Sequence, residues 1–214
     1  MSEVGDEFET VHTFKQSDGT RRVILRFPMD SYTMFQRFAV KFVNKPVHVD
    51  MVLDKQKTTN RKFYYTMYMG EKFTMNMIPK YSLDDKLFEN WAFSVTDGEF
   101  EKMTTYISKL VDRVTYNYVD TMMLMPMMPH TGMFVDTMVP DVDGTQPENL
   151  HKLFCSQAMV LILRESLDED GPNQNLLLKL RSLNSRLTSP SDLYHLLRNY
   201  SSALPNKELG SEEV

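Results

Sequence analysis

The chain has 214 residues, of which 42% are hydrophobic and 25% charged, the proportions of an ordinary globular protein with a sizeable core. Its net charge of −5 argues against a general nucleic-acid-binding protein, which usually carries a basic face. No apolar run reaches the roughly 18–20 residues that span a bilayer, the N-terminus lacks the pattern of a signal peptide, and one cysteine rules out an internal disulfide, so we expect a cytoplasmic protein without a transmembrane segment.

The first half of the chain has the pattern of a sheet interrupted by one helix. In chain order we expect a flexible acidic arm, a strand, a helix, a second strand, a hairpin and a fifth strand: 1–20, 22–27, 31–43, 47–53, 63–69 with 72–78, and 91–95. Alternation along 47–53 places His48 and Asp50 on the same face of that strand. Thr96 and Glu99 then form a capping box that opens a helix to about residue 114.

A methionine-rich segment follows, with seven methionines in 122–138 and prolines that make a continuous helix there unfavourable. Methionine fills irregular gaps in cores and also lines adaptable binding surfaces. The first interpretation is core filling, the second a protein-binding surface, and the third copper coordination by thioethers, against which the irregular spacing argues. We therefore expect neither a metal nor a cofactor, and 122–138 is the candidate contact with protein partners.

The last third of the chain predicts helices. Apolar spacing indicates them over 150–167, 176–183 and 190–200, the last beginning with an N-cap and a proline at Ser189-Pro190. A disordered tail is expected over 203–214. Strands followed by helices indicate an α+β domain over 21–202 with one antiparallel sheet.

Cys155, the single cysteine, precedes the apolar part of the 150–167 helix. A thiol in the first turn of a helix lies near the positive end of the helix dipole and next to unpaired N–H groups, which favours the nucleophilic thiolate. Ala158, Met159 and Ile162 share its helical face, so the competing interpretation is a small hydrophobic residue packed in the core. This stretch alone does not decide between the two.

A thiolate nucleophile needs a general base, normally a histidine held by a third polar group. Of five histidines, His48 is the one on a predicted central strand, which is a rigid platform for a base. His12 and His130 fall in a predicted arm and loop, His151 lies one turn before Cys155, and His195 is midway along the last helix. A part-buried histidine with a structural hydrogen bond is the alternative for His48.

Three passages, in this order, resemble the circularly permuted branch of the NlpC-type papain-like cysteine hydrolases, in which the histidine precedes the cysteine. VILRFPMDSYTMFQRFAVKFVNKPVHVDMVL resembles the family's strand, helix and histidine strand. WAFSVTDGEFEKMTTYISKLVDRVTYNYVD resembles its strand, capped helix and tyrosine passage. LFCSQAMVLILRESL with LTSPSDLYHLL resembles its nucleophile helix and a later Thr-Pro-x-Asp-Leu element, so the similarity spans about residues 22–198.

The resemblance implies a permuted papain-like fold, with an antiparallel sheet packed against a helix that carries the nucleophile. It implies Cys155 as nucleophile and His48 as general base, with Gln157 and Tyr116 as substrate-binding residues. The third catalytic position is open: Thr66 is the best match on the strand after the histidine strand, and Asp50 shares a face with His48. A threonine hydroxyl can orient an imidazole but does not stabilise imidazolium as a carboxylate does.

The function implied is a peptidase- or amidase-type thiol hydrolase acting on an amide, ester or thioester bond of a peptide or acyl-linked substrate. The alternative is an inactive member of the same fold that serves as a binding or structural component. Because members of the family occur in large DNA viruses, that component would be packaged in a virus particle. A globular adaptor unrelated to papain is the third reading.

Overall fold

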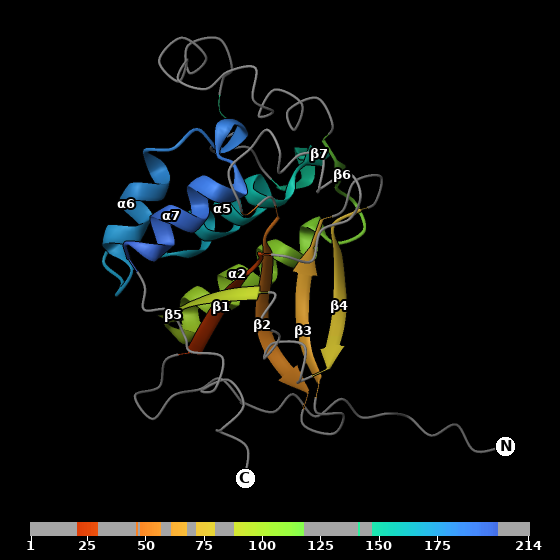
Figure 1. Ribbon diagram of the computed structural model, residues 1–214, viewed down its shortest axis with the longest axis horizontal. Coiled ribbons are helices and arrows are strands. Elements are labelled where there is room, and N and C mark those ends of the chain that lie inside the picture. Colours follow the sequence, from red (N-terminus) through yellow and green to blue (C-terminus); the bar gives the residue numbers. More distant parts are fainter. Residues whose placement is uncertain are drawn as a thin grey trace, which may run out of the picture.

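The computed structural model describes residues 21–29, 46, 48–56, 61–67, 72–79, 88–117, 141 and 147–200. The arm over 1–20, the helix over 31–43, the methionine-rich segment 122–138 and the tail over 203–214 lie outside these residues. The described elements are, in order, β1 Arg21–Pro28, β2 Asp50–Gln56, β3 Arg61–Thr66, β4 Thr74–Pro79, β5 Phe88–Val95, α2 Asp97–Leu110, β6 Thr115–Tyr116, η2 Pro147–Asn149, β7 Lys152–Leu153, α5 Cys155–Ser166, α6 Gln174–Arg181, η3 Ser185–Leu187 and α7 Pro190–Arg198 (Figure 1).

The main sheet has five strands in the order β4-β3-β2-β1-β5, and every neighbouring pair is antiparallel. The expected α+β class with an antiparallel sheet is therefore confirmed. Several expected boundaries were wrong. The strand expected over 47–53 is β2, which begins at Asp50 and reaches Gln56, so His48 lies two residues before the strand. It extends past residue 53 because it stays paired with β3 after a register shift between Val52 and Asp54. The strand expected from 91 begins at Phe88, and the helix expected from 150 begins at Cys155.

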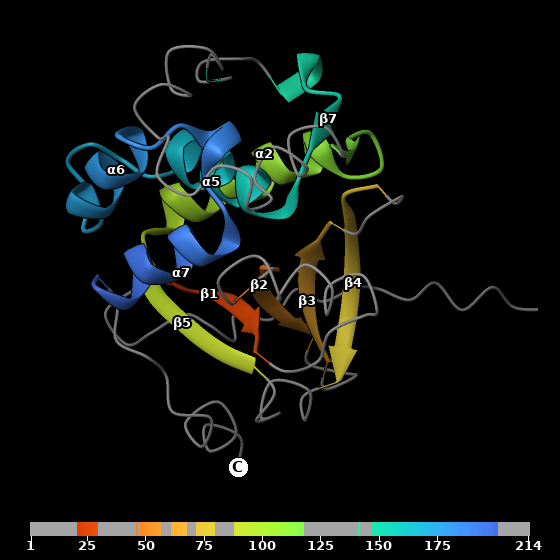
Figure 2. The same ribbon diagram turned by 45° about the horizontal axis from the view of Figure 1, so that its top comes forward.

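One hydrophobic core joins the sheet to the helices. Alternate residues of the central strands, among them Leu25, Met51 and Trp91, belong to the same buried cluster as α2 and α5. In Figure 2 the helices α2, α5 and α7 lie to one side of the sheet. In α5 every residue from Cys155 to Arg164 is buried, which makes it the central helix. None of the helices in the described ranges is long and apolar enough to cross a membrane.

Two of the predicted helix starts are confirmed by their capping contacts. The Thr96 side chain accepts a hydrogen bond from the Glu99 amide at 3.1 Å, and Glu99 accepts one from the Thr96 amide at 2.8 Å. At α7, Ser189 and Asp192 form the same reciprocal pair, with proline in the first turn. Short side-chain contacts therefore fix where both helices begin.

A short parallel pair, β6 with β7, was not predicted from the sequence. Its backbone hydrogen bonds run from Thr115 N to His151 O at 2.9 Å and from Asn117 N to Leu153 O at 2.7 Å. Two-residue strands are too short to show a periodic pattern. The pair matters because Leu153 is two residues before Cys155, so it anchors the chain at the point where α5 begins.

Candidate active site

A row of polar residues crosses the central strands of the sheet. Arg26 of β1 is paired in register with Asn90 of β5 on one side and Asp50 of β2 on the other. Directly paired residues present their side chains on the same face. Arg26 donates to Asp50 Oδ2 from Nη2 at 2.6 Å and from Nε at 3.2 Å, and both side chains are buried. The pairing register thus creates a buried ion pair within the sheet.

The imidazole of His48 extends this row. Its Nε2 lies 2.9 Å from Asp50 Oδ1 and 3.0 Å from Thr66 Oγ1, and the ring is 6% exposed. Thr66 also hydrogen-bonds to the Asp50 carboxylate. When Nε2 carries its proton, it donates to the two oxygens, and the threonine hydroxyl is free to donate to the carboxylate. Asp50 and Thr66 together therefore orient the imidazole.

Cys155 meets His48 from the start of α5. The thiol hydrogen-bonds to the imidazole, and since Nε2 faces Asp50 and Thr66, we assign Nδ1 to the sulfur. Phe154 occupies the N-cap of α5 and offers no side-chain acceptor, whereas α2 and α7 both have capping boxes. The first-turn N–H groups next to the sulfur therefore lack the side-chain cap that would normally satisfy one of them.

The charges in the cluster shift two pKa values strongly. Burial by itself lowers the pKa of His48, but the negative charges of Asp50 and Cys155 and their hydrogen bonds outweigh burial and raise it to about 10. Burial opposes ionisation of Asp50 too, and the charges of His48 and Arg26 with hydrogen bonds from His48 and Thr66 lower its pKa to about 2. At neutral pH, the favoured state pairs an imidazolium with a carboxylate on one side and the sulfur on the other.

Comparison of the chain with models of protein families, with curated proteins and with solved structures found no match. The geometry of the site is consequently what supports a function. It brings together the four residues expected to be catalytic, Cys155, His48, Asp50 and Thr66, although they come from separate parts of the chain. The two candidates for the third position are not exclusive, because both contact Nε2.

Arg26 and Asn90, two residues of this polar row, were not expected from the sequence. A signal was present, since Arg26 interrupts the apolar run VILRF of a strand. Arginine is almost never fully buried unless it is paired, so its partner could have been sought on a neighbouring strand. The register that brings it to Asp50 was not predictable from either strand alone.

The structure places the two expected substrate-binding residues differently. Tyr116 is half-buried in β6 and lies opposite Leu153, which is two residues before the start of α5. Gln157 is two residues after Cys155, about 200° around the helix, and so points away from the thiol side. Its Oε1 is buried without a hydrogen-bond partner. A contact of Gln157 with a substrate at Cys155 is therefore not supported by the direction of its side chain.

The remaining histidines do not compete with His48 within the described residues. His151 and His195 are both exposed. His12 and His130 lie outside the residues that the structure describes. Across the described ranges, no three His, Cys, Asp or Glu side chains are grouped so that they could hold a metal ion.

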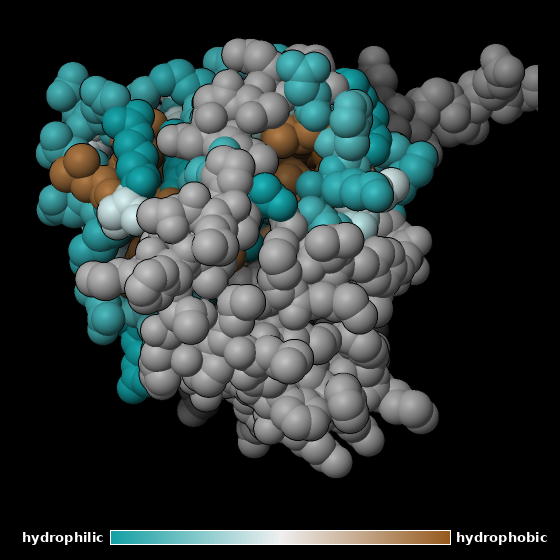
Figure 3. All heavy atoms as spheres, turned by 90° about the horizontal axis from the view of Figure 1, so that it is seen from above, coloured by the Kyte–Doolittle hydropathy of each residue, from teal (hydrophilic) through white to brown (hydrophobic). Residues whose placement is uncertain are grey.

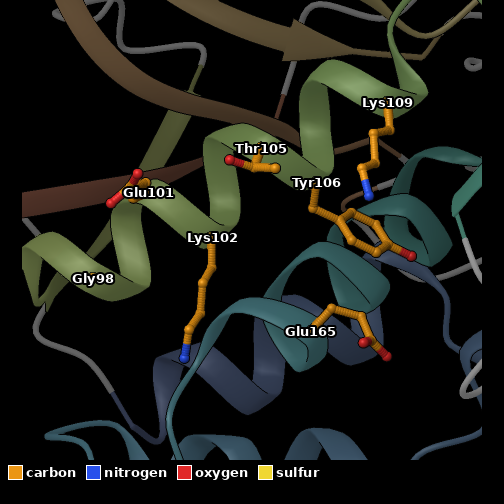
Figure 4. A pocket seen from close by; sticks show the side chains of 7 residues that line it. All are labelled: Gly98, Glu101, Lys102, Thr105, Tyr106, Lys109 and Glu165. Carbon is orange, nitrogen blue, oxygen red and sulfur yellow. The ribbon is translucent and has the colours of Figure 1, made fainter.

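A groove of about 490 Å³ lies elsewhere, between α2 and the far end of α5 (Figure 4). Its lining is mostly polar and of mixed charge: Gly98, Glu101, Lys102, Thr105, Tyr106, Lys109 and Glu165. Glu165 is ten residues after Cys155, about 15 Å along the helix axis. The groove is therefore separate from the cysteine and histidine.

The described surface seen from the helical side is mainly hydrophilic, with small hydrophobic areas (Figure 3). Large hydrophobic side chains that are exposed in the described residues are Met75 and Leu178. They belong to β4 and α6, elements at different ends of the fold (Figure 1). The described part of this surface therefore shows no extended hydrophobic patch of the kind that binds a partner protein.

Proposed function

We propose that the chain is a papain-like cysteine hydrolase of the circularly permuted NlpC type that cleaves an amide, ester or thioester bond by acyl transfer. The observation that carries the proposal is the contact between Cys155, at the start of a buried helix, and His48, whose other nitrogen is held by Asp50 and Thr66. A nucleophile, a base and an orienting group within hydrogen-bond reach are the recurring parts of such sites. The order of histidine before cysteine is that of the family the sequence resembles.

The first half of the reaction forms a thioester. The Cys155 thiolate attacks the carbonyl carbon, and N–H groups in the uncapped first turn of α5 stabilise the resulting oxyanion. The His48 imidazolium donates its proton to the leaving nitrogen, oxygen or sulfur as the bond to the carbonyl carbon breaks. The products of this half are the free leaving group, a neutral imidazole and an acyl group on the sulfur.

The second half uses the same histidine as a base. Once the sulfur is acylated its negative charge is gone, and with it one of the interactions that raise the pKa of His48. The imidazole takes a proton from water, the hydroxide oxygen attacks the thioester carbonyl, and the thiolate leaves with the electron pair. The acid product departs, and the imidazolium with its thiolate is regenerated.

The test is the formation and hydrolysis of an acyl adduct with p-nitrophenyl acetate, followed by intact-mass spectrometry. Wild type should gain one acetyl group on Cys155 and lose it again, and Cys155→Ser should gain none there. His48→Gln should slow acetylation and hydrolysis of the adduct by about 10²-fold, the usual contribution of general acid–base catalysis. His195→Gln is the matched control, because His195 is exposed on α7. Equal rates in His48→Gln and wild type would contradict the proposal.

A second function is favoured by the burial of the site. Cys155 is 2% and His48 6% exposed. A site kept closed would suit a member of the same fold that has lost turnover and acts as a binding or structural component, such as a component of a virus particle with the methionine-rich segment 122–138 as its contact. Full-length protein that forms no acetyl adduct, with an intact fold by circular dichroism, would favour this function over hydrolysis.

A further inference from the structure

We propose that Arg26 is a positioning residue of the site, which orients the Asp50 carboxylate toward His48 and balances its charge. The inference rests on the proposed pairing of Cys155 with His48, and it adds a fifth residue that the family resemblance did not supply. Arg26 would touch neither substrate nor the reacting sulfur. It acts through Asp50, and its effect should be visible in the behaviour of His48 and Cys155.

Arg26 fixes the orientation of the Asp50 carboxylate. Arg26 donates from Nη2 and Nε to the same oxygen, Asp50 Oδ2, at 2.6 and 3.2 Å, and the other oxygen, Oδ1, lies 2.9 Å from His48 Nε2. A carboxylate held by one oxygen cannot rotate its other oxygen away from the imidazole without breaking two charge-assisted hydrogen bonds. The guanidinium is itself held, because it lies 4.5 Å from the centre of the Phe88 ring.

Arg26 also balances the negative charge of Asp50 within the buried cluster. His48 faces Asp50 on its own segment, Thr66 from β3 and Cys155 from α5, and Asp50 faces Arg26 from β1. With thiolate and imidazolium formed, the cluster holds two positive and two negative charges. Without Arg26, the carboxylate would bind the imidazole proton more tightly and would disfavour the thiolate. Arg26 therefore sets the pH range over which the ion pair exists.

The experiment measures how fast iodoacetamide alkylates Cys155 across a range of pH, with the imidazole of His48 followed by NMR. Cys155 is the single cysteine, so alkylation reports one site. The variants are Arg26→Gln, the charge-preserving Arg26→Lys, and the double variant Arg26→Gln with Asp50→Asn, which removes both charges and avoids an unpaired buried carboxylate. All are compared as full-length chains after their fold is checked by circular dichroism.

Arg21 supplies a matched control on the same strand. It forms an ion pair with Asp97 at 2.6 Å and lies 4.5 Å from the centre of the Phe100 ring, so it has the same two kinds of contact as Arg26 but away from His48. Arg21→Gln should leave the alkylation profile unchanged. A general effect of losing an arginine from β1 would appear in this variant as well.

In Arg26→Gln the alkaline limit of the reactive range, where His48 loses its proton, should move to higher pH by less than about one unit, because Arg26 is a like charge that contacts Asp50 and not the ring. Arg26→Lys should return most of the shift. The double variant should move the limit below that of wild type, because Asp50 contacts the ring directly and raises its pKa. A folded Arg26→Gln protein with the wild-type profile would overturn the inference while leaving the proposed function intact. A wild-type thiol with no reactive range at all would instead overturn the proposed function.

Discussion

The two carboxylate oxygens of Asp50 have different partners, the permanently charged Arg26 and the titratable ring of His48. This arrangement explains the protonation state of the site. Oδ2 is engaged by Arg26 and Oδ1 by His48. Buried charges are costly unless they are paired and hydrogen-bonded, and each charge here has both kinds of partner. In the proposed reaction, this proton distribution would make His48 an acid in the first half and a base in the second.

The protonation of His48 can be measured directly. Because its pKa is raised to about 10, the ring should stay protonated through neutral pH and lose its proton only in the alkaline range. Cys155→Ser removes one of the negative charges that raise the pKa, and Asp50→Asn removes the other, so either variant should release the proton at lower pH. NMR of the imidazole carbons and nitrogens, assigned with His48→Gln, gives the titration. A ring that is neutral at pH 7 in wild type would contradict the ion-pair state.

The sequence was sufficient to propose the residues of the site, but it did not predict how they are arranged. Cys155 and His48 could be proposed because each has a recognisable local context, a helix start and a run of alternating residues. Asp50 and Thr66 were left as alternatives, since the sequence does not say whether one or both reach the ring. Arg26 was missed because its partner is fixed by the pairing of β1 with β2, which neither strand specifies alone.

At the scale of elements, α5 carries Cys155, the proposed nucleophile, and side-chain contacts hold both of its ends. Ser156 Oγ donates to Thr188 O at 2.7 Å near its start. Near its end, the buried Arg164 donates to the carbonyl of Leu180 at 2.9 Å and to Asp141 at 2.8 Å. These contacts tie α5 to α6, to Asp141 and to the chain before α7, so its first turn has little freedom to move away from His48.

The capping box of α2 is expected to stabilise more than its own helix. Glu99 uses Oε2 for the Thr96 amide and Oε1 for the amide of Asp168, just after α5, at 3.0 Å. Thr96→Ala should cost about 1 kcal/mol of unfolding free energy. Glu99→Ala should cost roughly 2–3 kcal/mol, because two partly buried N–H groups lose their acceptor. Urea denaturation measures both.

Ser189→Ala is the comparison for these cap variants. In the described contacts, Asp192 of the α7 capping box binds Ser189 and no residue at the end of another helix. It should cost about 1 kcal/mol. If Glu99→Ala is no more destabilising than Thr96→Ala, the bridge from α2 to the end of α5 contributes nothing measurable. None of the three changes should alter the reactivity of Cys155 in the folded state.

Elements with strong local signals were predictable, and those made by tertiary contacts were not. The capping box of α2, the N-cap and proline of α7 and the apolar spacing of α5 predicted these three helices, although the expected start of α5 was five residues too early. The start of β2 and the pair β6–β7 were misplaced or missed because pairing partners distant in the chain define them. The segments 31–43, expected to be a helix, and 122–138, expected to contact protein partners, lie outside the described residues.

For the whole molecule, the antiparallel sheet and the buried α5 bring two residues more than 100 positions apart into contact. The expected α+β class is confirmed at that coarse level, and the permuted papain-like assignment stays a proposal that rests on the site. The sheet supplies Asp50, Thr66 and Arg26, the segment just before β2 supplies His48, and α5 supplies the sulfur. The proposed function requires that His48 and Cys155 exchange a proton across this contact.

The most direct test is the alkylation rate of Cys155 by iodoacetamide at pH 7, in the folded chain, in the folded His48→Gln variant and in the urea-unfolded chain. A thiolate paired with His48 should react roughly tenfold faster in the folded wild type than in either comparison, because a free thiol is only a few per cent ionised at this pH. A folded wild type that reacts more slowly than the unfolded chain, at a rate that His48→Gln leaves unchanged, would contradict the account.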